Sequence, residues 1–185
     1  MRRNYEIKVP VTNIKLAKWK TGSYIRKFDN RHHLVEMQKD IYYKVPGERM
    51  KLRIINNKSG NLIYYNRDEK DVKRISKYIL AKAENPQELD EILRKFFKIL
   101  VVVSKTRDIY IADNIRIHLD NVEGLGDFIE FEIVYNNLIS AKKKMKELID
   151  YYELDEKDFI KESYSDMLLK KQKRGHAINR EKRHT

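Results

Sequence analysis

Charged side chains recur at every second position in several stretches of this 185-residue sequence. In residues 3–10, Asn4, Glu6 and Lys8 alternate with apolar residues. A β-strand has a side-chain period of two, so it would place these three polar groups on one face. The same alternation assigns a polar face to other stretches, with the members Lys51, Arg53, Arg67, Lys105, Arg107, Arg116, His118, Asp120, Glu130 and Glu132.

The cations and the carboxylates of this set are largely segregated by strand. The cationic positions are Lys51, Arg53, Arg67, Lys105, Arg107 and Arg116, and the anionic positions are Glu6, Asp120, Glu130 and Glu132. Arginine and lysine bind phosphate oxygens, whereas Mg²⁺ or Mn²⁺ binds carboxylates and bridges to phosphates. The pattern therefore predicts a site for a polyanion together with divalent cations.

The elements that would position these residues are mostly strands. Helices are expected from a cap at Thr12 or Asn13 to a stop at Gly22, from Pro86 to about Lys98, and over 140–151. The stretch 85–88 reads Asn-Pro-Gln-Glu, which is a strong signal for a helix start. Strands are expected over 3–11, 38–45, 48–55, 61–67, 74–81, 101–112, 115–122 and 127–135, and a short packed element over 163–169.

These strands with few helices indicate an α+β fold built on a closed or nearly closed antiparallel sheet. In the commoner arrangement, apolar residues fill the barrel and charges face water. In the inverted arrangement, charges line the inside and helices cover the apolar outer face. Two features favour inversion: amphipathic helices need an apolar surface to pack on, and surface charges need no sorting by strand. We therefore predict a closed eight-stranded barrel, or tunnel, with a polar, charged lumen and flanking helices.

Composition narrows the class of protein. The sequence has 41% hydrophobic and 37% charged residues, no cysteine and a net charge of +12. Its longest apolar run, at 99–103, is far below the ~20 residues of a membrane span. No apolar segment typical of a signal peptide follows the N-terminus. We therefore expect a cytoplasmic protein, no membrane association and anionic partners, with one domain over 1–169 and a basic, flexible tail over 170–185.

Several stretches together resemble one family, the CYTH superfamily of triphosphate tunnel metalloenzymes, which includes class IV adenylyl cyclases and thiamine triphosphatases. The resemblance covers residues 4–169 and is strongest to the branch labelled class IV adenylyl cyclase-like. The stretches are NYEIK, QKDIYYKVPGERMKLR, LIYYNR, SKTR, IRIHLDNVEGLGDFIEFE and SYSDML. The resemblance implies an eight-stranded antiparallel tunnel flanked by helices, in agreement with the inverted arrangement.

The resemblance also implies a role for each polar position. Glu6, Lys8 and Arg53 would be catalytic, and Glu6, Asp120, Glu130 and Glu132 would hold Mg²⁺ or Mn²⁺. The triphosphate would be held by Lys8, Lys51, Arg53, Arg67, Lys105, Arg107 and Arg116, with Arg74 as a further member if 74–81 is a strand. One position departs from the family: Asn4 stands where the Glu-x-Glu-x-Lys signature has its first glutamate, which removes one carboxylate from the expected metal cluster. His118 fits a hydrogen-bonding role in the lumen better than a general base.

Three functions follow from this set of residues. The first is a metal-dependent phosphohydrolase acting on inorganic, nucleoside or thiamine triphosphate. The second is a class IV adenylyl cyclase, which also needs a purine pocket that the sequence does not locate. The third is a non-catalytic module that binds nucleotides or polyphosphate. A nucleic-acid partner is disfavoured because the cations are interleaved with acids. Family likeness suggests a homodimer.

Overall fold

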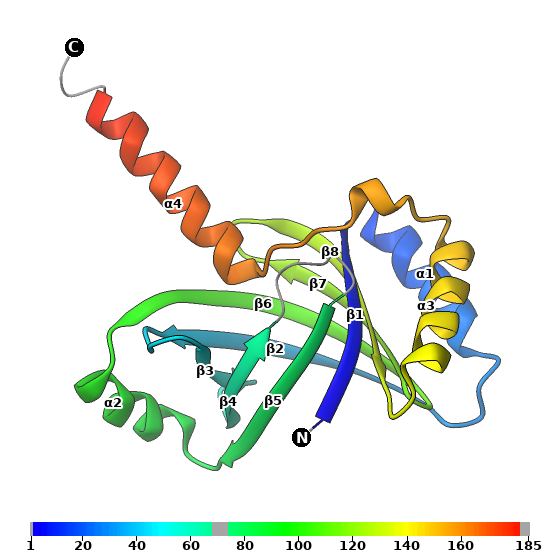
Figure 1. Cartoon of the computed structure of the whole chain (residues 1–185), viewed down its shortest axis with the longest axis horizontal. Helices are drawn as coiled ribbons and strands as arrows, with labels where there is room; N and C mark the ends of the chain where they lie inside the picture. The colour runs from blue at the N-terminus through cyan, green and yellow to red at the C-terminus, as the bar shows by residue number, and fades with distance from the viewer. Residues whose placement is uncertain (1, 68–73, 182–185) are drawn as a thin grey trace.

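The computed structural model describes the backbone of residues 2–67 and 74–181 and the side chains of residues 4–65 and 78–175. This part of the chain forms an α+β fold in which a curled antiparallel sheet of eight strands carries four α-helices (Figure 1). The strands are β1 (Arg2–Pro10), β2 (Arg31–Tyr43), β3 (Arg49–Ile55), β4 (Ser59–Arg67), β5 (Arg74–Ala83), β6 (Ile99–Ala112), β7 (Ile115–Val122) and β8 (Gly126–Val134). The helices are α1 (Ile14–Ile25), α2 (Pro86–Phe96), α3 (Leu138–Tyr152) and α4 (Tyr164–Glu181), with a 3₁₀ helix η1 (Glu156–Asp158).

The strand order follows the chain closely. Hydrogen-bonded neighbours run β5-β4-β3-β2-β6-β7-β8, and β1 pairs antiparallel with both β5 and β8. The first strand therefore lies between the two ends of the sheet (Figure 1). This pairing also brings Glu6 opposite Glu132 and Lys8 opposite Glu130.

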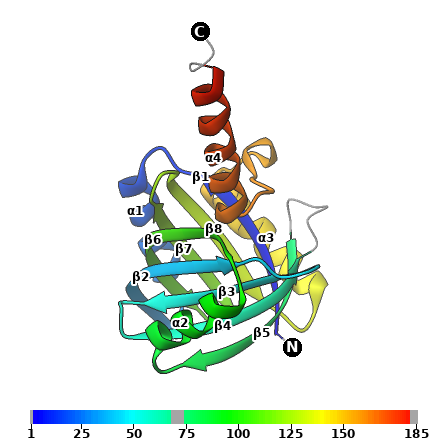
Figure 2. The ribbon, with the colours of Figure 1, turned by 90° about the vertical axis from the view of Figure 1, so that its left-hand side faces the viewer.

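The helices pack on the apolar outer face of the sheet. Ile7, Ile117 and Phe131 are fully buried in one cluster with side chains of α1 and α3. A second cluster joins Leu93 of α2 to β2 and β3, on another part of the sheet (Figure 2). The apolar side chains of β1, β7 and β8 thus face helices rather than the inside of the curled sheet.

Asparagine side chains begin three of the helices. The side chains of Asn13, Asn85 and Asn137 each accept a hydrogen bond from the backbone N–H three residues later. Such a cap satisfies one of the backbone donors that have no partner within the helix. The predicted start at Asn85 is confirmed, and of the two caps predicted for the first helix, Thr12 and Asn13, the structure uses Asn13.

Two predicted boundaries were wrong. Helix α1 does not stop at Gly22 but continues to Ile25, because Tyr24 and Ile25 are buried in the core. Strand β2 begins at Arg31 rather than near residue 38, because it pairs with β6 along its entire length. Tertiary packing outweighs the weak local signal in both stretches.

Helix α4 is longer than the short element predicted over 163–169, and it runs without a break into residue 170, where the predicted tail begins (Figure 1). Its backbone is helical to Glu181, and the division between domain and tail remains a prediction. None of the helices within the described ranges is long and apolar enough to cross a bilayer.

Candidate active site

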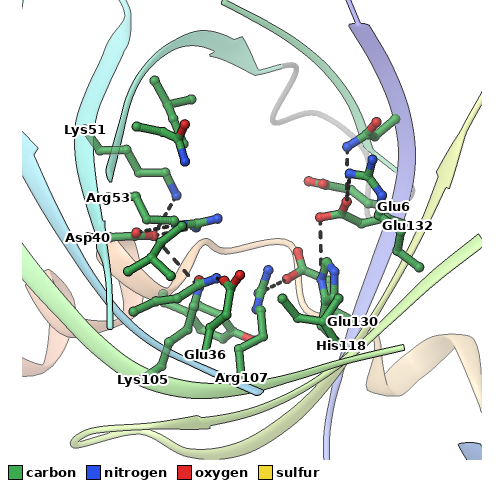
Figure 3. Close-up of a pocket in the computed structure, with 18 of the residues that line it drawn as sticks. Glu6, Glu36, Asp40, Lys51, Arg53, Lys105, Arg107, His118, Glu130 and Glu132 are labelled. Carbon is green, nitrogen blue, oxygen red and sulfur yellow. Dashed lines mark hydrogen bonds and ion pairs between the residues drawn. The ribbon is translucent and has the colours of Figure 1, made fainter. Parts of the chain in front are cut away.

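A cavity of about 390 Å³ lies inside the curl of the sheet. Figure 3 shows charged side chains pointing into it from several strands, with Lys51, Arg53 and Lys105 on one side and Glu6 and Glu132 on the other. The alternation seen in the sequence is the cause, because each strand turns every second side chain inward.

Asp40 holds the cations of β3 in place. Its Oδ1 accepts a hydrogen bond from Arg53 Nε at 2.7 Å, and its Oδ2 accepts from Lys51 Nζ at 2.7 Å and from Arg53 Nη2 at 2.8 Å. Burial by itself would raise the pKa of Asp40, but Arg53 and Lys51 outweigh that effect and hold it well below its usual range. Asp40 is therefore a carboxylate at neutral pH and keeps two cations oriented.

Lys105 lies nearby and is almost completely buried. Its Nζ is 3.8 Å from Asp40 Oδ2, too far for a hydrogen bond. Burial lowers the pKa of Lys105 to about 7, and the positive charge of Arg107 adds to this effect. Near neutral pH this amine is therefore divided between its charged and neutral forms.

Arg107 connects the cationic side to the carboxylates. Its Nε and Nη2 donate to the two carboxylate oxygens of Asp120 at 2.6 and 2.5 Å, and Nη2 also donates to Glu130 Oε2 at 2.7 Å. Burial would raise the pKa of Asp120, yet Arg107 brings it down to about 2. Burial likewise opposes ionisation of Glu130, and Arg107 and Lys8 overcome it to hold its pKa well below the usual range.

Negative charge is in excess where Glu6, Glu130 and Glu132 lie close together. Ligand atoms of His118, Glu130 and Glu132 lie within 4.8 Å of one another. Burial, followed by the charges of Glu130 and Glu6, raises the pKa of Glu132 to about 7. Burial and then Arg107 lower the pKa of His118 well below its usual value, so its imidazole is neutral. A neutral imidazole beside carboxylates is a donor set that divalent cations bind.

Asn4 borders the same cluster. Its Nδ2 donates to Glu132 Oε2 at 3.2 Å. Among the described residues, Asn4 Oδ1 and His118 Nδ1 are buried atoms without a hydrogen-bond partner. Buried polar atoms are usually satisfied, so two unsatisfied polar atoms beside Glu132 indicate room for a missing partner.

The first residue of α4, Tyr164, and the segment just before it close over one part of the cavity. The Tyr164 hydroxyl donates to Asp120 Oδ2 at 2.8 Å, and its ring lies 4.0 Å from Lys8 Nζ. Lys8 Nζ also donates to the carbonyl of Glu162 at 3.2 Å. Arg49 Nη1 anchors the segment by donating to Ser163 Oγ at 3.0 Å.

Most of the predicted site residues share this cavity. Its walls include Glu6, Lys8, Lys51, Arg53, Lys105, Arg107, Arg116, Glu130 and Glu132. Arg116 is the most loosely held, with its Nη1 3.8 Å from Glu132 Oε2. The side chains of Arg67 and Arg74 lie outside the described residues, so their predicted roles remain predictions; the backbone of Arg74 lies opposite Glu6.

Asp120 has other partners than the predicted metal. Both of its oxygens are taken by Arg107 and Tyr164, it is fully buried, and it is not among the residues that line the cavity. Its geometry favours a role in positioning Arg107.

Sequence reasoning missed the polar residues of β2. Glu36, Gln38 and Asp40 all line the cavity. Their alternation was the available signal, but part of this strand was not recognised. His118 was predicted as a hydrogen-bonding residue, and its place beside Glu130 and Glu132 makes it a candidate metal ligand as well.

Comparisons with known proteins agree with this arrangement. A protein of Methanocaldococcus jannaschii named "Putative adenylate cyclase" is 26% identical over 176 residues, covering 88% of this chain and 96% of the relative. A solved structure of a Pyrococcus horikoshii protein, also 26% identical, superposes with a TM-score of 0.77 and covers 90% of this chain and 98% of that one. A Mimivirus capping enzyme triphosphatase shares the fold, with a TM-score of 0.53, 16% identity, and coverage of 82% of this chain and 89% of that one.

The family model that matches is the CYTH domain, over residues 2–164. The match begins in β1, which carries Glu6 and Lys8, and ends at Tyr164, which contacts Lys8 and Asp120. It therefore spans the strands that surround the charged cavity, and the chain belongs to the CYTH domain family.

Proposed function

We propose that this chain is a metal-dependent phosphohydrolase that cleaves a triphosphate held in the cavity. The observation that carries the proposal is the division of one cavity into two halves. Lys51, Arg53 and Lys105 form a cationic half, and Glu6 and Glu132 contribute to an anionic half (Figure 3). A triphosphate and its divalent cations need both halves together.

In this proposal the sheet is a closed tunnel with a charged lumen. The pairing of β1 with both β5 and β8 supports closure. The outward packing of apolar side chains on α1 and α3 supports an interior reserved for polar groups. A closed sheet would exclude bulk water around the phosphates, and that strengthens each electrostatic contact.

The residues present fit a divalent cation. Glu6, Glu130, Glu132 and His118 would hold it, since His118 Nδ1 is unsatisfied, and burial together with the negative charges of Glu130 and Glu6 raises the pKa of Glu132. Mn²⁺ accepts an imidazole ligand more readily than Mg²⁺ does. When bound, the ion would neutralise charge on the phosphate oxygens. Asp120 is left out of this set because Arg107 occupies it.

The chain's own cations would supply the rest of the chemistry. Lys51, Arg53 and Lys105 would bind and align the phosphates, while Lys8 and Arg53 would stabilise charge that develops during transfer. Water would attack the terminal phosphorus, the bridging P–O bond would break, and orthophosphate and the diphosphate would leave. Positioning and charge neutralisation are the main contributions a protein makes to phosphoryl transfer.

A second candidate is adenylyl cyclisation, in which a ribose 3′-hydroxyl attacks the α-phosphorus and pyrophosphate leaves. The name of the Methanocaldococcus jannaschii relative favours it. The same two halves of the cavity would serve either reaction, and only the nucleophile differs.

Product analysis tests the proposal. The protein is incubated with inorganic triphosphate, ATP or thiamine triphosphate and Mg²⁺ or Mn²⁺, and the products are resolved by anion-exchange chromatography. Orthophosphate with a diphosphate product supports hydrolysis, and cyclic AMP with pyrophosphate supports the cyclase. No turnover of any of the three would reject both enzymatic functions and leave a binding module.

Two variants test the assignment of the site. Glu130→Gln should abolish turnover, because it weakens both the metal set and the pair with Arg107. Glu153→Gln is the matched control, since Glu153 pairs with Lys20 at the surface, far from the cavity lining. Unchanged activity in Glu130→Gln would show that the metal set is wrong.

A further inference from the structure

Helix α4 begins in contact with the rest of the molecule and then leaves it. The Tyr164 ring packs on Phe128, and Met167, Leu168 and Leu169 lie against the same apolar cluster. From residue 170 to residue 175 every side chain is exposed. Figures 1 and 2 show the C-terminal part of this helix pointing away from the sheet and from the other helices. The turns after residue 169 therefore form a projection from the folded domain.

This projection carries a dense group of positive charges. We call them the α4 cations, and they are Lys170, Lys171, Lys173 and Arg174. The sequence has no acidic residue between positions 170 and 180. The α4 cations thus differ from the cations of the strands, which are interleaved with carboxylates and point into the cavity.

Two of the α4 cations have partners and two do not. Lys170 pairs with Glu162, and Lys171 Nζ donates to the carbonyl of Gly124 at 2.7 Å. Among the side chains that the structure describes, none pairs with Lys173 or Arg174. These two side chains are therefore available to an anion from solution.

The arrangement works against the helix that carries it. Lys170 is three residues from Lys173 and four from Arg174, so three like charges lie beside one another on the helix surface. Gly175 is a poor helix former. A helix without an apolar face to pack is marginal in water. A polyanion alongside would remove the repulsion and stabilise these turns.

The residue types of the projection favour one class of polyanion. A helix that lies on a membrane needs an apolar face, and protein partners usually meet an apolar or aromatic centre. Residues 170–175, KKQKRG, supply neither. They also lack the aromatic side chains on which proteins stack the bases of single strands. Lysine and arginine alone suit the phosphates of a duplex, which carries one charge per about 1.7 Å of its axis.

We propose that the projecting part of α4 binds the phosphate backbone of a double-stranded nucleic acid, with Lys173 and Arg174 as the main contacts. The inference does not depend on the proposed function, because the α4 cations are not among the residues that line the cavity. Contacts to phosphates alone carry no sequence information, so the binding is expected to be independent of sequence.

Fluorescence anisotropy of labelled duplexes tests the inference on the full-length protein. The probes are a DNA duplex and an RNA duplex of the same sequence, both with 5′-hydroxyl ends. At physiological salt the wild type should bind at least one of them with a Kd of about 10⁻⁶ to 10⁻⁴ M. The double variant Lys173→Gln with Arg174→Gln loses two phosphate contacts. The slope of log K against log salt should become less steep by about 1.8, and binding at 0.1 M salt should weaken by about tenfold or more.

The matched control is the double variant Lys142→Gln with Lys143→Gln. Both lysines are exposed on α3, so this variant loses the same charge from another part of the molecule (Figure 1). Charges farther than about 10 Å from the phosphates are screened at 0.1 M salt. The control should therefore keep the wild-type salt slope and bind the duplex within about threefold of the wild type. Circular dichroism checks that both double variants are folded.

Equal losses in the two double variants would overturn the inference, because binding would then follow net charge rather than α4. Absence of binding to either duplex at low salt would also overturn it. Vesicles that contain phosphatidylserine are the competing ligand, and tighter binding to them than to both duplexes would assign α4 to a membrane surface instead. The duplex that binds more tightly identifies DNA or RNA as the source of the phosphates.

Discussion

Asp40→Asn is the sharpest test of how the cationic half of the cavity is built. The substitution preserves shape and removes the charge that Lys51 and Arg53 share. Asp40 is 2% exposed, and the side chains of its two partners are 13% and 18% exposed. Removing one partner of a buried ion pair costs about 3–5 kcal/mol. Because both cations touch the cavity and can regain some water, we expect the lower limit, a loss of about 3 kcal/mol in the free energy of unfolding.

Urea denaturation followed by circular dichroism measures this loss. The experiment is repeated with inorganic triphosphate and EDTA. A bound anion supplies the negative charge that the variant lacks, so the difference between the wild type and Asp40→Asn should shrink with triphosphate present. A ligand stabilises the folded protein in proportion to the logarithm of the ratio of the ligand's concentration to Kd. If triphosphate stabilises Asp40→Asn more than the wild type, the variant must bind triphosphate more tightly.

Asp108→Asn is the matched control. Asp108 lies on β6, where its Oδ2 pairs with Lys18 Nζ at 2.9 Å, but it is not among the residues that line the cavity. Its Oδ1 also contacts His33 Nε2 at 3.2 Å, and because Lys18 and His33 are both about half exposed, the two contacts together should be worth less than about 1 kcal/mol. A loss in Asp40→Asn no larger than in the control would refute the argument from burial. A loss that triphosphate leaves unchanged would show that these cations do not bind the anion.

Three other predictions concern protons, metal and the C-terminal helix. The pKa of Lys105 is lowered from 10.5 to about 7, so its amine is mostly neutral at pH 8. A bound triphosphate should raise this pKa, and the protein should then take up as much as about 0.9 proton per triphosphate bound. Calorimetry in buffers of different ionisation enthalpy measures the uptake, and equal uptake in Lys105→Met would contradict the assignment. Asn4→Glu places a third carboxylate beside Glu132, so Mn²⁺ should bind about tenfold more tightly in a titration, whereas weaker binding would show that position 4 does not face the metal. Truncation after Lys170 should leave turnover of small triphosphates within about twofold, since the cavity lining ends at Tyr164; a collapse in turnover would place residues beyond 170 within the catalytic domain.

Local alternation was enough to place most charged residues on one face of their strands. Lys51, Arg53 and Lys105 could be assigned in this way, because side-chain direction in a strand depends only on parity. The packing of helices on an apolar face of the sheet was also foreseeable, since amphipathic helices require an apolar surface to cover.

The sequence could not predict which charged residues would pair with one another. Arg107 and Asp120 are 13 residues apart and meet only because β6 and β7 pair in one register; a shift of one residue would turn Asp120 outward. That register occupies Asp120 with Arg107 and leaves His118, two residues earlier, beside Glu130 and Glu132. The sequence alone did not distinguish these two roles.

The sequence by itself thus determined which residues share one face of each strand, because that depends on neighbours one and two positions away. Only the tertiary structure decided which charges neutralise one another and which are left for a ligand. The reason is that pairing energies depend on distance and burial, and these are set by contacts between strands far apart in the chain. Two residues of β2 show both outcomes. Asp40 is paired with two cations, whereas Gln38, two residues away, has an unsatisfied side-chain oxygen.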